Sequence, residues 1–245
     1  AMRMQQVRIG DFRIQSEHAG SGPAVVLLHG LSGSHRWWRF TTPVLARRFS
    51  VHVPELVGFG GSRKAHRQPR MPELAQVMAE WIGEIGLDTF DLVGHSMGGQ
   101  TAIHMAAGPA RPRRLVLVSA SGLPRPLSVR EGARFVAGML PPRHWGAPTF
   151  VPTIAADALR AGPRALLLAT RNLLTDDVTS LLPRIACPTL LVWGQYDPLV
   201  PLPYGERMAS SIPDGRLVVL HDAAHNPMCD RPEEFNRVLV EFLDA

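Results

Sequence analysis

Short, uninterrupted apolar runs alternate with amphipathic segments along most of the chain, and this alternation limits the folds open to it. Six runs have the length and hydrophobicity of strands buried on both faces. They lie at residues 24–28, 51–53, 90–93, 115–118, 189–193 and 217–220. Helical patterns fall between most of them, at residues 37–48, 72–85, 97–107, 203–211 and 232–243. This order predicts an α/β fold with a mostly parallel sheet flanked by helices.

Two segments depart from the alternation. At the start, alternating residues 7–9 and 12–15 flank Gly10-Asp11, which predicts a hairpin. Residues 122–183 contain no convincing strand and carry several prolines between helical pieces. Because sixty residues are too many for a plain loop, we expect residues 122–183 to form a helical cap insertion. Residues 1–121 and 184–245 would then make up the core domain.

Composition excludes several classes of protein. The chain has 245 residues, 45% of them hydrophobic, which is enough to bury a core. Two cysteines cannot form a disulfide scaffold, and no apolar run approaches the length of a membrane span. The net charge is +5, but Lys64 is the single lysine and the arginines form no basic stripe, which argues against nucleic-acid binding. With no apolar leader segment at the start of the chain, we expect a cytoplasmic location.

The segment Gly94-His95-Ser96-Met97-Gly98 directly follows an apolar run and precedes a helical pattern. It matches G-x-S-x-G in the strand–turn–helix setting that this motif requires. A serine on such a turn stands clear at the end of the strand, near a helix N-terminus that favours negative charge. Ser96 is therefore the predicted nucleophile, while the adjacent His95 is expected to pack away from it.

A serine hydroxyl needs a base within hydrogen-bond reach and a carboxylate to orient that base. Asp197 follows the apolar run that ends at Trp193, and His225 follows the run that ends at Leu220. Both positions are loops at the carboxyl ends of strands, where α/β active sites gather. Asp197 and His225 are the predicted acid and base.

Rivals exist for both roles. His221 competes with His225, and Asp222 and Asp230 compete with Asp197. The nearby Cys229 is interpreted as a packing residue.

Acyl chemistry also requires N–H donors for the developing oxyanion. The first strand run leads into His29-Gly30-Leu31, where Gly30 permits a turn that aims the Leu31 N–H inward. Leu31 and Met97 are the predicted oxyanion hole, and His29 is expected to anchor the loop.

These motifs resemble those of the α/β-hydrolase superfamily over nearly the whole chain. The matching segments are His29-Gly30, Gly58-Phe59-Gly60-Gly61-Ser62, Gly94 to Gly99, Gly194 to Asp197, and Ala224-His225. The resemblance implies an eight-stranded, mostly parallel sheet under a helical cap. It also implies a Ser96–His225–Asp197 triad with Leu31 and Met97 as oxyanion donors, and no cofactor or metal. One departure is Glu55, where such proteins usually have aspartate; we interpret that position as structural.

The leading hypothesis is a serine hydrolase that cleaves carboxylic esters of small to medium acyl chains through an acyl-enzyme. A carbon–carbon bond hydrolase or an enol-lactonase would use the same triad, and a hydrolase-like ligand receptor with slow turnover is an alternative of another class. The expected walls of the acyl pocket are Leu31, Trp38, Met97, Phe135, Leu140, Leu167 and Met228. Arginines of the insertion are candidates for gripping an anionic substrate or an acidic carrier protein: Arg125, Arg130, Arg134 and Arg143.

Overall fold

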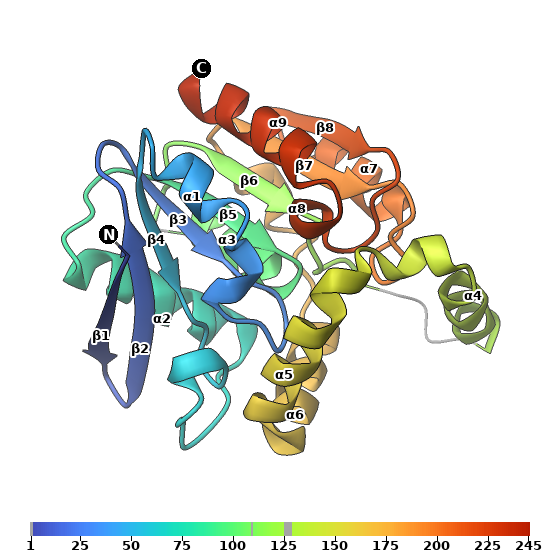
Figure 1. The fold of residues 1–245 in the computed structure, drawn as a ribbon, viewed down its shortest axis with the longest axis horizontal. Coiled ribbons are helices and arrows are strands. Elements are labelled where there is room, and N and C mark those ends of the chain that lie inside the picture. The colour runs from blue at the N-terminus through green and yellow to red at the C-terminus, as the bar shows by residue number, and fades with distance from the viewer. Residues whose placement is uncertain (1, 109, 125–128) are drawn as a thin grey trace.

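An eight-stranded sheet in the order β1-β2-β4-β3-β5-β6-β7-β8 forms the centre of the molecule (Figure 1). The structure, a computed structural model, describes residues 2–108, 110–124 and 129–245, without the side chains of residues 129, 131, 132, 134 and 135. The strands are β1 (Arg3–Ile9), β2 (Phe12–Ala19), β3 (Ala24–Leu28), β4 (Ser50–Pro54), β5 (Phe90–His95), β6 (Leu115–Val118), β7 (Thr189–Gly194) and β8 (Gly215–Leu220). Strands β3 to β8 run parallel, and β1 and β2 pair antiparallel. The predicted α/β fold with a mostly parallel sheet is confirmed.

The predicted hairpin joins β1 to β2 with Gly10 and Asp11 at its turn. Gly10 has a φ of +54°, a conformation that glycine adopts without strain. The two strands form one edge of the sheet, next to β4.

Helices cover both faces of the sheet (Figure 1). The α-helices outside the segment between β6 and β7 are α1 (Thr42–Leu45), α2 (Met71–Glu84), α3 (Met97–Ala107), α7 (Leu202–Ser211), α8 (Pro227–Asp230) and α9 (Pro232–Asp244). On one face, side chains of α2, α3 and α7 pack against strand residues such as Val26 and Leu117. On the other, α1, α8 and α9 pack against alternate residues such as Val25 and Val116. Strands buried on both faces explain the uninterrupted apolar runs.

The single helix predicted over residues 37–48 is wrong. The chain instead forms a short 3-10 helix at His35–Trp38 and the four-residue α1 at Thr42–Leu45. Pro43 stands in the first turn of α1. Because proline has no N–H to donate and its ring clashes with the preceding turn, it begins a new helix here rather than continuing one.

The segment between β6 and β7 holds α4 (Val129–Met139), α5 (Val151–Ala161) and α6 (Pro163–Thr175), linked by 3-10 turns. No strand occurs in its described residues. Figure 1 shows α5 and α6 as a pair and α4 further from the sheet. The division of the chain into a core domain and a cap over residues 122–183 stays a prediction. None of the helices described is long and apolar enough to cross a membrane.

Candidate active site

Ser96 occupies a strained turn between β5 and α3. Its φ is +51° and its ψ is −115°, a combination that L-residues rarely adopt and that costs about 1–3 kcal/mol. The turn lifts the serine off the end of a fully buried strand and places it at the start of an 11-residue helix. This is the strand–turn–helix geometry that the motif predicted.

Glycines make the turn possible because backbone lies where a side chain would stand. A Cβ added to Gly94 would lie 2.4 Å from the carbonyl oxygen of Gly98. A Cβ on Gly98 would lie 2.5 Å from the carbonyl oxygens of Leu28 and His29, at the end of β3. Real Cβ atoms essentially never approach this closely, so only glycine fits at either position.

The structure brings Ser96, His225 and Asp197 together from three distant parts of the chain. The distance between Ser96 Oγ and His225 Nε2 is 3.0 Å, and that between His225 Nδ1 and Asp197 Oδ2 is 2.9 Å. Because the carboxylate can only accept, Nδ1 carries the proton and Nε2 presents its lone pair to the serine hydroxyl. The imidazole is therefore held in the tautomer that a general base requires.

Backbone groups fix the Asp197 carboxylate in place. Its Oδ1 accepts hydrogen bonds from the N–H groups of Leu199 at 2.9 Å and Val200 at 2.8 Å. Its side chain is fully buried, and that of His225 is 12% exposed. The carboxylate thus has one oxygen bound to the loop and the other bound to the imidazole.

The predicted oxyanion donors lie at the same edge of the sheet, Leu31 in the loop after β3 and Met97 at the start of α3. Leu28 of β3 and Gly94 of β5 are register partners in the parallel pair. Leu31 follows Leu28 by three residues, and Met97 follows Gly94 by three. The close approach of Gly98 to Leu28 shows that the start of α3 touches the end of β3. Their role in binding an oxyanion stays a prediction.

His95 is buried beside the base. Its Nε2 donates to the backbone carbonyl of His225 at 2.8 Å, and the centroids of the two rings lie 4.9 Å apart. Burial lowers the pKa of His95 well below its usual value, and the nearby His225 acts in the same direction. The His95 imidazole is therefore neutral, and its buried Nδ1 has no hydrogen-bond partner among the described residues. As expected, the side chain packs inside the protein instead of facing the serine.

His29 and Glu55 support the loop that carries Leu31. The Nδ1 of His29 donates to the Gly30 carbonyl at 2.8 Å, and its Nε2 accepts from the Leu56 N–H at 3.0 Å. Burial lowers the pKa of His29, which keeps the ring neutral in this arrangement. Glu55 accepts hydrogen bonds from His35 Nδ1 at 2.7 Å and from the Gly61 N–H at 2.5 Å. These contacts agree with the structural interpretation of Glu55.

The rival residues take other positions. His221 and Asp222 are exposed, and His221 Nδ1 lies 3.2 Å from Gln195 Oε1. Asp230 accepts from the backbone N–H groups of Ala147 at 2.7 Å and Ala224 at 2.9 Å. It thereby ties the chain just before His225 to the segment between β6 and β7.

Burial raises the pKa of the Asp230 carboxyl, against the lowering effect of these N–H groups. Cys229 is buried, and burial raises the pKa of its thiol to about 12, so the thiolate that would act as a nucleophile does not form near neutral pH.

Four of the seven expected pocket walls fall into two groups. Trp38 and Met228 are buried in the hydrophobic core beneath α9, where Trp38 packs against Phe235 at 6.3 Å between ring centroids. Leu140 and Leu167 are each 71% exposed, so neither is enclosed between the insertion and the sheet. The spacing pattern marked these residues as apolar but did not say which way each would point. The side chain of Phe135 lies outside the described residues.

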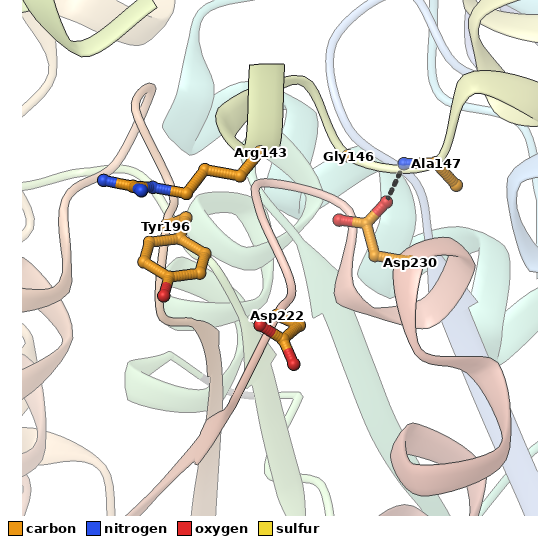
Figure 2. A pocket seen from close by; sticks show the side chains of 6 residues that line it. All are labelled: Arg143, Gly146, Ala147, Tyr196, Asp222 and Asp230. Carbon is orange, nitrogen blue, oxygen red and sulfur yellow. Dashed lines mark hydrogen bonds between the residues drawn. The ribbon is translucent and has the colours of Figure 1, made fainter. Parts of the chain in front are cut away.

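A pocket of about 250 Å³ opens beside the loop that carries Asp197. Figure 2 shows Tyr196, Asp222 and Asp230 around it, with Arg143 above the tyrosine. The guanidinium carbon of Arg143 lies 4.9 Å from the centre of the Tyr196 ring. A cation–π contact of this kind holds the arginine over the ring.

Of the other three arginines proposed to bind an anion, only one has a side chain that the structure describes. Arg130 is exposed, whereas Arg125 and the side chain of Arg134 lie outside the described residues.

One residue near the site was missed by sequence reasoning. Asp157 on α5 is buried, and its Oδ2 accepts from Ser34 Oγ at 2.9 Å and from Trp37 Nε1 at 3.0 Å, while Arg36 pairs with Oδ1. This carboxylate anchors α5 to the turn that follows the Leu31 loop. The signal available in the sequence was a lone aspartate among alanines on an amphipathic helix.

Among the described residues, no cluster of three or more histidine, cysteine, aspartate or glutamate side chains could hold a metal ion. The residues gathered around Ser96 supply a hydroxyl, an imidazole and a carboxylate, which suits nucleophilic acyl chemistry.

Known proteins resemble this chain over most of its length. The sequence model of the alpha/beta hydrolase family matches residues 25–238. The chain is 31% identical to the pimeloyl-[acyl-carrier protein] methyl ester esterase of Chromobacterium violaceum, over 94% of this chain and 97% of that protein. It is 27% identical to the 2-hydroxy-6-oxo-6-phenylhexa-2,4-dienoate hydrolase of Burkholderia cepacia, over 96% and 92% of the two chains. The solved structure of a thermophilic esterase from Thermogutta terrifontis superposes with a TM-score of 0.84 at 28% identity, over 99% and 98% of the two chains.

Proposed function

Because the chain belongs to the alpha/beta hydrolase family, we propose that it is a serine hydrolase that cleaves carboxylic esters of small to medium acyl chains. The observation that carries this proposal is the unbroken series of contacts from Ser96 Oγ through His225 to Asp197, at 3.0 Å and 2.9 Å. A hydroxyl, a correctly protonated imidazole and a buried carboxylate in this order make an activated nucleophile.

In the proposed mechanism, Ser96 Oγ attacks the ester carbonyl while His225 Nε2 takes the hydroxyl proton. Asp197 stabilises the imidazolium that forms. The carbonyl oxygen becomes an oxyanion, which the N–H groups of Leu31 and Met97 bind; each such donor is worth about 3 kcal/mol in the transition state. Collapse of the tetrahedral intermediate breaks the ester C–O bond, and the alcohol leaves with the proton from His225.

Water then completes the cycle. His225 takes a proton from a water molecule whose oxygen attacks the acyl-enzyme carbonyl. The second tetrahedral intermediate expels Ser96 Oγ, which regains its proton, and the carboxylic acid is released. The segment between β6 and β7 is the proposed cap over the acyl pocket, tied to the core through Asp157 and Asp230.

A carbon–carbon bond hydrolase that uses the same triad is the second candidate, favoured by the Burkholderia cepacia relative. His95 weighs against it, since the carbon–carbon enzymes often carry asparagine before the serine. A methyl ester on an acidic carrier protein is a more specific form of the ester proposal, suggested by the Chromobacterium violaceum relative.

Purified wild-type protein and Ser96→Ala, assayed against p-nitrophenyl butyrate, lactones and ring-cleavage diketones, test the proposal. We expect ester turnover by the wild type and a loss of roughly 10⁴-fold or more in Ser96→Ala, with an unchanged circular dichroism spectrum. Turnover near the wild-type rate in Ser96→Ala would refute the nucleophile. Turnover of the diketones with none of the esters would instead select the carbon–carbon reaction.

A further inference from the structure

Helix α6 presents an outer face of alternating arginine and leucine. Arg164, Leu167, Arg171 and Leu174 follow one another at spacings of three, four and three residues, which places them on one side of a helix. Leu167 is 71% exposed and Leu174 is 61% exposed, and both arginines are exposed. The four residues, which we call the α6 outer face, span about 15 Å along the helix axis.

The opposite side of α6 is firmly packed. Ala169 is buried in the core, and Leu166 and Leu173 pack against the same cluster. The helix is therefore held by a complete inner face, and the leucines of its outer face are additional to those that its folding requires. Large apolar side chains that gather on one exposed face, rather than being scattered singly, are typical of interaction surfaces.

A groove runs along the same helix. It has a volume of about 490 Å³, and the chain that begins α2 forms its other side. Two cations, Arg70 and Arg171, line it together with the apolar side chains of Met71 and Leu168. Asp176 also lines it, but its carboxylate is engaged by Gln100 Nε2 at 2.8 Å and His104 Nε2 at 2.7 Å. The groove thus joins positive charge to apolar surface next to the α6 outer face.

The exposed side chains described from α4 to α6 have the same character. Seven of the large exposed apolar side chains described lie within residues 136–174: Val136, Leu140, Trp145, Val151, Leu159, Leu167 and Leu174. Among the side chains described in residues 129–175, the exposed charged ones are all arginines, namely Arg130, Arg143, Arg160, Arg164 and Arg171. The one carboxylate described there, Asp157, is buried. This part of the molecule therefore complements a partner that is both anionic and apolar.

We propose that the α6 outer face and its groove dock on a membrane surface that contains anionic phospholipids. Arginines would bind lipid phosphates while the leucines enter the region between headgroups and acyl chains, as in interfacial amphipathic helices. A second copy of the chain fits less well, because a two-fold contact would set the arginines of one face against those of the other. The docking is independent of the proposed hydrolysis, since it uses none of the residues around Ser96.

Co-sedimentation of the 245-residue chain with vesicles tests this inference. The measurement uses the Ser96→Ala background, so that the proposed hydrolysis cannot degrade the lipids. We expect the protein to bind vesicles of phosphatidylcholine with phosphatidylglycerol, to bind pure phosphatidylcholine much less, and to be released by salt. Each arginine at such a surface changes the binding constant by about fivefold. The double variant Arg164→Gln/Arg171→Gln should therefore bind these vesicles about 25-fold more weakly. Leu174→Asn should weaken it severalfold.

Matched controls lie on the opposite part of the fold. Arg216→Gln on β8 removes an exposed arginine, and Met4→Asn on β1 removes an apolar side chain that is 52% exposed. Neither residue lines the groove. Both should bind like the parent chain. Equal binding to neutral vesicles, no binding to either kind, or the same loss in the controls would overturn the proposal.

Three further results would overturn it by identifying another occupant. One is full competition by inorganic phosphate at matched ionic strength, which would assign the groove to a free anion. Another is a dimer, detected by light scattering, that becomes a monomer when both Arg164 and Arg171 are replaced with glutamine. The third is capture of an acidic carrier protein by the same two arginines without any vesicle binding.

Discussion

The imidazole of His95 donates a hydrogen bond from Nε2 to the backbone carbonyl of His225 at 2.8 Å. The residue before the proposed nucleophile thus holds the backbone of the proposed base. A Cβ on Gly30 would lie 2.8 Å from His95 Nδ1, so the same ring also abuts the loop that carries Leu31. One buried, neutral side chain therefore contacts two of the segments on which the proposed acyl transfer depends.

Replacing His95 with phenylalanine keeps an aromatic ring but removes the donor. We expect the free energy of unfolding to fall by about 1–3 kcal/mol, because the buried carbonyl of His225 loses its partner. We also expect kcat for an ester to fall by about 10–100-fold with little change in KM, because the base shifts relative to Ser96. His95→Gln, which retains an N–H donor, should lose less. Steady-state kinetics that match the wild type in His95→Phe would contradict this role.

Two helical glycines test whether close packing constrains the tight turn at Ser96. Gly98 adjoins that turn, and Gly83 in α2 is its matched control. Gly98→Ala should destabilise the fold by about 1–3 kcal/mol, because its Cβ would clash with the carbonyl of Leu28. Gly83→Ala in α2 should be neutral or stabilising by up to about 1 kcal/mol, because nothing lies within 4 Å of its Cβ and alanine favours helix. Urea unfolding monitored by circular dichroism measures both. Equal effects of the two substitutions would show that the close approach at Gly98 does not constrain the turn.

Asp157 predicts a local effect on α5. Asp157→Asn removes the charge that pairs with Arg36 and places an amide where a carboxylate oxygen accepted its hydrogen bond. We expect faster hydrogen exchange in Val151–Ala161 and a loss of about 1–3 kcal/mol in the free energy of unfolding. The exposed Arg160→Gln on the same helix is the control and should leave exchange unchanged. Unaltered exchange in Asp157→Asn would show that the helix is held by other contacts.

The His35–Glu55 pair predicts a pH dependence of stability. The hydrogen bond to Glu55 raises the pKa of His35 above 6.5, against burial. Burial raises the pKa of Glu55, but the bonds from His35 and the Gly61 N–H outweigh it and hold that pKa below 4.5. The stability due to His35 is full below about pH 6.5 and is lost as pH rises through the raised pKa. That due to Glu55 is full above about pH 4.5 and is lost as pH falls through the lowered one.

His35→Gln should therefore cost more at about pH 5.5 than at about pH 8.5. Urea unfolding of wild type and variant at both values gives the two differences. A cost that is the same at both values would mean that protonation of His35 does not contribute to stability.

The sequence was sufficient for the fold class because the signals are local. Unbroken apolar runs such as residues 115–118 favour strands buried on both faces, and the turn at Ser96 requires glycine on either side. The positions of Asp197 and His225 followed from the rule that loops at the carboxyl ends of parallel strands meet. The prediction of one helix over residues 37–48 was wrong because it relied on the apolar periodicity and gave too little weight to Pro43, where a new helix begins.

Other features depend on contacts between distant residues, which periodicity does not encode. Asp157 and Trp37 are 120 positions apart, and His95 and His225 are 130 apart. The direction of Leu140 and Leu167 depends on how the helices between β6 and β7 pack, so their apolar character alone suggested a pocket wall where the structure exposes them.

The central claim is that Ser96 forms a covalent acyl-enzyme with the help of His225. Mass spectrometry of the intact chain and its peptides after reaction with an alkyl fluorophosphonate tests it most directly. We expect one equivalent of adduct on the peptide that contains Ser96, formed at a rate that falls steeply in His225→Ala, together with loss of ester hydrolysis. An adduct on another residue, or full hydrolysis by protein whose Ser96 is completely modified, would contradict the account.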